Sequence, residues 1–155
     1  SLVLLAIAFQ KAKAARSCQL SRRIQRNFLS TQEQDLVNLA TDSLHPITMG
    51  TKDSLELLCK RKPDLASVHL ALARIAARQG DRFHAARAYH AAITADPNLV
   101  DAKVPHSISI ELKNFLVVAY PQIDAAHQKH PDDDQIEETW SLTNHSKRML
   151  AGGCE

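Results

Sequence analysis

Residues 66–99 read ASVHLALARIAARQGDRFHAARAYHAAITADPNL, and this stretch determines the expected fold. Small or apolar residues stand where two antiparallel helices would have to touch. Gly80 can adopt the left-handed conformation that closes a helix, Asp81 can cap the helix that follows, and Pro97 cannot continue it. The stretch therefore predicts a helical hairpin that turns at Gly80.

Three equally spaced prolines extend this arrangement along the chain. Pro63, Pro97 and Pro131 stand 34 residues apart, and each follows a helix-like stretch and precedes Asp or Asn. A fixed period of this length is typical of a two-helix repeat. The intervals expected to form helical hairpins are 32–65, 66–99 and 100–133.

The central interval resembles a tetratricopeptide repeat. Ala85, Tyr89 and Ala92 occupy the small, aromatic and small sites of the family's second helix. The two alanines share one helical face and let a neighbouring helix come close, while the tyrosine fills the groove between them. His69 and Ala76 depart from the pattern, because they replace two aromatic residues of the family's first helix.

The flanking intervals are weaker copies of the same frame. In 32–65, the residues expected at the core positions of the two helices are Leu36, Leu39, Ala40, Leu55 and Leu58. In 100–133, the matching sites of the second helix hold Ala119, Ile123 and Ala126. We expect Pro105 and Pro121 to shorten or bend the helices of this interval.

Composition agrees with a single helical domain. Aromatic residues make up only 5% of the chain and alanine is abundant, which favours closely packed helices over a sheet sandwich. We therefore expect an all-α protein, a short tetratricopeptide-like solenoid of about three helical hairpins with an extended amphipathic helix before it and a capping helix after it. The expected parts are a basic arm over 1–31, the repeats over 32–133, and a capping helix with a frayed tail over 134–155.

The basic arm differs from the rest of the chain in charge. Residues 1–32 contain six bases and no acid, whereas the remaining residues contain 17 acids and 13 bases. Leu20, Ile24 and Phe28 step by four and form one apolar stripe on a predicted helix. The arm residues expected to contact a partner are Lys11, Lys13, Arg16, Leu20, Arg22, Arg23, Ile24, Arg26 and Phe28.

Several uses of the arm remain open. An arginine-rich, acid-free amphipathic segment is typical of mitochondrial targeting, and a retained one would serve as an anchoring helix. The apolar run over 2–9 is too short to span a bilayer but could contact a membrane. Basic residues also bind acidic protein surfaces or RNA phosphates, although the arm lacks interleaved aromatic residues for base stacking. A solvated basic face on a helix that caps the solenoid is the simplest alternative.

The acidic residues of the tail are better explained by helix capping than by calcium binding. Asp134 and Glu137 have the spacing of a capping box, and negative charge stabilises a helix amino terminus. The predicted apolar contacts of this helix are Ile136, Trp140, Leu142 and Leu150, with the tryptophan as the anchor.

Catalytic and cofactor motifs are not found in the sequence. It has no glycine-rich phosphate loop and no nucleophile elbow, and its four glycines are expected in turns or in the tail. His127 and His130 lie within one helical turn but lack a third metal ligand at helical spacing. The cysteines are few, odd in number and widely spaced, which favours a reducing compartment. We therefore expect a non-enzymatic chain without a cofactor or metal.

The resemblance implies binding of peptides or partner subunits in a concave groove lined by the first helices of the repeats. The groove candidates in this chain are His69, Arg74 and Arg78. The main expectation is a scaffold or protein-protein interaction subunit of a larger multisubunit complex in the mitochondrion, with the cytoplasm as the alternative location. The alternative functions are a receptor or adaptor that captures a peptide in the groove, and an RNA-associated subunit that uses the arm.

Overall fold

The computed structural model describes residues 29–42 and 48–152, and all regular structure in these two ranges is helical. This confirms the expected all-α class. The described α-helices, with one short 3-10 helix, are α2 (Thr31–Thr41), α3 (Met49–Arg61), α4 (Ala66–Arg78), α5 (Arg82–Ala95), η1 (Pro97–Val100), α6 (Ser109–Lys129) and α7 (Asp134–Leu150). The predicted arm helix and its nine partner-binding residues lie outside the described residues.

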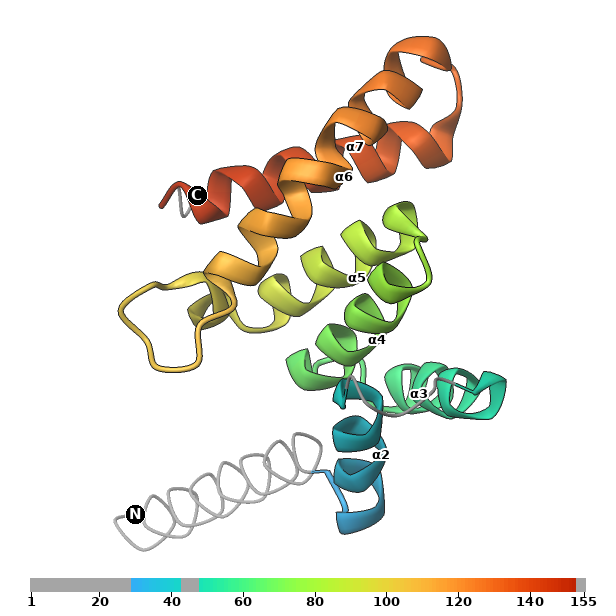
Figure 1. Cartoon of the computed structure of the whole chain (residues 1–155), viewed down its shortest axis with the longest axis vertical. Helices are drawn as coiled ribbons and strands as arrows, with labels where there is room; N and C mark the ends of the chain where they lie inside the picture. Colours follow the sequence, from blue (N-terminus) through green and yellow to red (C-terminus); the bar gives the residue numbers. More distant parts are fainter. Residues whose placement is uncertain (1–28, 43–47, 153–155) are drawn as a thin grey trace, which may run out of the picture.

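Helices α4 and α5 form the middle of the molecule (Figure 1). On one side, α2 and α3 both pack against α4, and on the other, α6 and α7 both pack against α5. None of the helices within 29–42 and 48–152 combines the length and the apolar character needed to cross a bilayer.

The α4–α5 hairpin has the local features that its sequence predicts. Gly80 has a φ of 78°, and the Asp81 carboxylate accepts a hydrogen bond from the His84 backbone N–H at 3.2 Å. Ala85 and Ala92 are fully buried, since their small side chains lie where neighbouring helices approach. The turn and the helix contacts of this hairpin are therefore confirmed.

Helices α2 and α3 are held together at their ends and along one face. Ser30 and Glu33 form a capping box at the start of α2, and the Glu33 carboxylate also pairs with Lys62 after α3 at 2.8 Å. The hydrogen bond from Lys62 has the largest effect, and together with the contacts to Ser30 it lowers the pKa of Glu33 to about 2. Leu55 and Leu58 are fully buried, as predicted.

Two details of this first pair differ from the prediction. Leu39 is 42% exposed, because Val37 takes its place beside Ala40 on the buried face of α2; the prediction for Ala40 is confirmed. Gly50 was predicted in a turn, but it lies in the first turn of α3, where Thr48 provides the cap.

The interval 100–133 contains one α-helix, not the predicted two. Residues 101–108 form turns and irregular backbone, and Pro105 lies in one of the turns, where its fixed φ and missing N–H are tolerated. The first helix of this interval is therefore missing, and α6 runs unbroken for 21 residues through Pro121. The helix that packs beside α6 is α7, so the pair spans 109–150 (Figure 1).

Helix α7 buries small polar side chains. Its cap is Asp133, one residue before the predicted Asp134, and the buried face carries Thr139, Thr143 and Ser146. Each of these hydroxyls donates to a carbonyl four residues earlier in α7, so all three have a hydrogen-bond partner. Because these side chains are small, α7 can pack closely on the alanine-rich α5.

Candidate functional site

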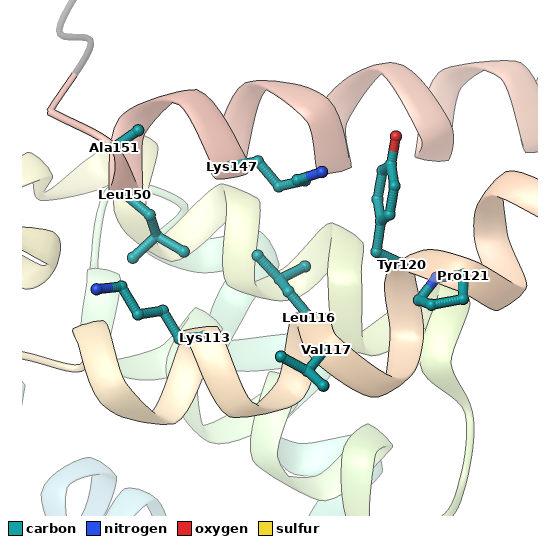
Figure 2. A pocket seen from close by; sticks show the side chains of 8 residues that line it. All are labelled: Lys113, Leu116, Val117, Tyr120, Pro121, Lys147, Leu150 and Ala151. Carbon is teal, nitrogen blue, oxygen red and sulfur yellow. The ribbon is translucent and has the colours of Figure 1, made fainter.

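An open apolar pocket of about 640 Å³ lies between α6 and the end of α7. Its lining residues are Lys113, Leu116, Val117, Tyr120, Pro121, Lys147, Leu150 and Ala151. Figure 2 shows Leu116 and Leu150 between the two helices, with Lys113 near one end and Tyr120 and Pro121 at the other. We call this surface the α6–α7 groove.

The groove exists because α6 is apolar on two faces. One face contributes Leu112, Ala119 and Ile123 to the protein interior, where all three are fully buried. The other face carries Ile110 and Val117, which lie seven residues apart on one side of the helix and are 76% and 74% exposed. Val117 also lines the pocket, and an exposed aliphatic side chain beside an apolar pocket typically contacts another molecule.

Polar contacts fix the end of the groove formed by Tyr120. Its hydroxyl donates to Asn144 Oδ1 at 3.2 Å, and Lys147 Nζ lies 3.6 Å from the centre of the ring. Figure 2 shows the Lys147 ammonium group directed toward the Tyr120 ring between the two helices, an arrangement in which the cation is attracted to the ring face. Pro121 has no N–H, so it cannot donate the hydrogen bond that the carbonyl of Val117 would otherwise accept.

The groove is positively charged at its rim. Lys113 and Lys147 are its two charged side chains, and the described residues that line it include no carboxylate. Neither lysine takes part in the ion pairs found between described residues. The chemistry offered to a partner is therefore an apolar floor with an ammonium group contributed by each wall.

Two of the three predicted groove residues bind backbone groups at helix ends. His69 Nε2 lies 2.7 Å from the carbonyl oxygen of Pro63, and its Nδ1 lies 3.4 Å from Cys59 Sγ. Arg78 donates to the carbonyls of Ala40 and Asp42 at the end of α2, at 2.5 and 3.3 Å. Both side chains thus attach α4 to the preceding helix pair.

Arg74 joins α4 to α6 through Glu111. The Glu111 carboxylate accepts two hydrogen bonds from Arg74 and one from the Tyr89 hydroxyl, all at 2.8 Å. Burial alone would raise the pKa of Glu111, but the bonds from Arg74 and Tyr89 outweigh it and lower that pKa. The same bond to Glu111 raises the pKa of Arg74. A partner-binding role for His69, Arg74 and Arg78 remains a prediction, while their observed contacts are within the chain.

Two histidine contacts join α7 to its neighbours outside the groove lining, one from His90 of α5 and one from His127 of α6. His90 Nε2 and His145 Nδ1 are 2.8 Å apart, and burial, followed by the proximity of His145, lowers the pKa of His90. His127 stacks on Trp140 with the ring centres 4.1 Å apart and bonds to Glu137. Within the described ranges, no group of three or more His, Cys, Asp or Glu side chains is placed to hold a metal ion.

The sequence contained one signal for the groove that the repeat frame concealed. Residues 115–120 read FLVVAY, and six consecutive apolar residues cannot all face the core from one helix. The proline spacing predicts two short helices in 100–133, and in that arrangement the run is not recognised as two apolar faces of one long helix. Comparison with protein families, with curated proteins and with solved structures finds no match to this chain.

Proposed function

We propose that this chain is a non-catalytic protein-protein interaction subunit that binds another protein in the α6–α7 groove. The observation that carries the proposal is the apolar face of α6, where Val117 lines the pocket and remains 74% exposed. Such a face costs solvation free energy unless a partner covers it, and a partner of matching shape gains that free energy on binding.

The internal contacts of the chain favour a rigid scaffold. Arg74, Arg78 and His69 attach α4 to the helices on both sides of it, which fixes the relative positions of the helix pairs. Each helix pair also packs on the next, since α4 contacts both α2 and α3, and α5 contacts both α6 and α7. We propose on this basis a short tetratricopeptide-like stack of three helix pairs, with α6 and α7 as the third pair.

The sequence of the arm favours a larger assembly in the mitochondrion. Residues 1–32 carry six bases without an acid, which is the composition of mitochondrial targeting and anchoring segments. In this proposal the arm attaches the subunit to its assembly and the groove receives a second protein.

The test compares Val117→Asp with Val118→Asp. Both residues are exposed valines on α6, at 74% and 51%, but only Val117 lines the pocket. Tagged full-length proteins are expressed in cells, and the proteins that co-purify are quantified by mass spectrometry. We expect Val117→Asp to deplete a specific partner at least tenfold and Val118→Asp to retain it. Equal recovery with both variants would contradict the proposal.

A further inference from the structure

The charge of the α6–α7 groove restricts what can bind there. Its only charged lining groups among the described residues are Lys113 on α6 and Lys147 on α7. Two ammonium groups beside one apolar floor favour a segment that carries carboxylates next to its apolar side chains, and they repel a basic segment.

The length of the apolar surface favours a helix over a small molecule. On the exposed side of α6, Ile110, Val117 and Pro121 lie along about 16 Å at the rise of an α-helix, with Lys113 between the first two. Ligand pockets for small molecules enclose most of the ligand, whereas here Val117 and Ile110 are about three-quarters exposed. A helix that lies along such a surface contacts it through residues spaced three, four and seven apart.

The same charge argument disfavours the basic arm of the chain itself as the occupant. Residues 1–32 contain only basic charged residues, so they would place positive groups beside Lys113 and Lys147. This repulsion acts equally on the arm of a second copy. A partner segment with the opposite charge is favoured instead.

We propose that the α6–α7 groove binds an acidic amphipathic helix of a partner protein, with the partner's apolar stripe on Val117 and Leu150 and its carboxylates beside Lys113 and Lys147. This inference rests on the proposed function and specifies the chemistry of the partner. The lysine pair sets the preference for acidic segments, and the apolar floor supplies most of the affinity.

The experiment uses two synthetic helical peptides of about 18 residues, or five turns, with the full-length protein. They share one leucine stripe and differ only in the flanking residues, which are Glu in one peptide and Lys in the other. Binding is measured by fluorescence anisotropy at low and high salt. We expect the wild type to bind the Glu peptide on the order of tenfold more tightly, with the preference reduced at high salt.

Variants make the test specific to the groove. The double variant Lys113→Glu, Lys147→Glu should reverse the preference and favour the Lys peptide. The matched control is Lys103→Glu, Lys129→Glu, which makes the same change in net charge at exposed lysines outside the groove lining and should keep the preference for the Glu peptide.

Several results would overturn the inference. If the wild type binds both peptides equally and Val117→Asp weakens both, the groove binds helices without regard to charge, and the proposed function stands without this inference. If Val117→Asp weakens neither peptide, or if neither binds at millimolar concentration, both the inference and the proposed site are wrong.

Three competition outcomes would assign another occupant and would likewise overturn the inference. Displacement of the Glu peptide by dodecanoate, but not by its uncharged alcohol, would indicate an anionic lipid. Displacement by a free peptide with the sequence of residues 1–28 would indicate the arm. A mass in light scattering that doubles with concentration, and that Val117→Asp returns to the monomer value, would indicate a second copy.

Discussion

Arg74 on α4 and Glu111 on α6 form a bidentate ion pair across 37 residues of sequence, with Nε to Oε1 and Nη2 to Oε2 both at 2.8 Å. Tyr89 on α5 donates to the same carboxylate, so three helices meet at one side chain. The pair therefore connects α4, which contacts α2 and α3, to α6, which forms one wall of the groove. It gives the groove a fixed position relative to the rest of the molecule.

Removal of this pair should destabilise the fold. Arg74→Ala leaves the half-buried Glu111 carboxylate without its cation, and we expect a loss of about 1–2 kcal/mol in the free energy of unfolding. Urea denaturation followed by circular dichroism measures it. The control is Arg87→Ala, since Arg87 pairs with Glu138 at 3.5 Å on a more exposed surface and should cost at most about 0.5 kcal/mol. Equal losses in the two variants would show that the bidentate geometry adds nothing.

The His90–His145 contact should make stability depend on pH. Because the pKa of His90 is lowered in the folded protein, its contribution to stability is full above the ordinary histidine pKa and declines as the pH falls through the lower folded value. We expect the difference in unfolding free energy between wild type and His90→Asn to shrink from pH 7.5 to pH 5, measured by urea denaturation at each pH. If the difference in unfolding free energy between wild type and His90→Asn did not change with pH, the lowered pKa of His90 would be contradicted.

The packing of α7 on α5 should depend on small side chains. Thr143 is 1% exposed, so Thr143→Leu inserts extra volume into a filled interface, and we expect a loss of about 1–3 kcal/mol. Ser141 lies on the exposed side of the same helix, and Ser141→Leu should change the free energy of unfolding by less than about 0.5 kcal/mol. Thermal denaturation of both variants checks this. A Thr143→Leu variant as stable as the wild type would mean that α7 lies further from α5 than described.

Gly80, which lies between α4 and α5, and Gly50, which lies in the first turn of α3, should respond oppositely to alanine. Gly80 has a φ of 78°, which strains any residue with a Cβ, so Gly80→Ala should destabilise the protein by about 1 kcal/mol. Gly50 lies in α3, and an added Cβ would meet only Thr48 Oγ1 at 3.9 Å, an ordinary contact. Gly50→Ala should therefore stabilise it by about 0.5 kcal/mol. Denaturation midpoints that shift in the same direction would contradict this assignment.

The central hairpin could be predicted from sequence because its signals are local. Gly80, Asp81 and Pro97 each act on the backbone within a few residues, and Ala85 and Ala92 fit the helix period that these boundaries set. The third helix pair could not be predicted from the proline spacing alone. Pro131 ends α6, as the frame requires, but Pro121 lies inside that helix and Pro105 lies in a turn, so equal spacing did not imply equal helix lengths.

The groove depends on tertiary structure in a way that sequence does not reveal. The chain carries apolar residues on two sides of α6, and which side is buried depends on where α5 and α7 pack. The contact of Arg74 could not be predicted for the same reason, because its partner Glu111 belongs to α6, a helix that the proline spacing did not predict. Local patterns predicted the helices of the central hairpin, whereas long-range packing determines which side of α6 is exposed.

Site-specific photo-crosslinking from α6 tests the central claim that the α6–α7 groove binds another protein. A photoreactive phenylalanine replaces Val117 in the groove, Val118 on the neighbouring side of α6, or Leu57 on α3, which are all more than half exposed. After irradiation in cells, crosslinked proteins are identified by mass spectrometry. We predict one specific crosslinked protein from position 117 that is absent or strongly reduced from positions 118 and 57. A crosslink to the same protein with equal yield from all three positions, or from position 57 alone, would contradict the claim.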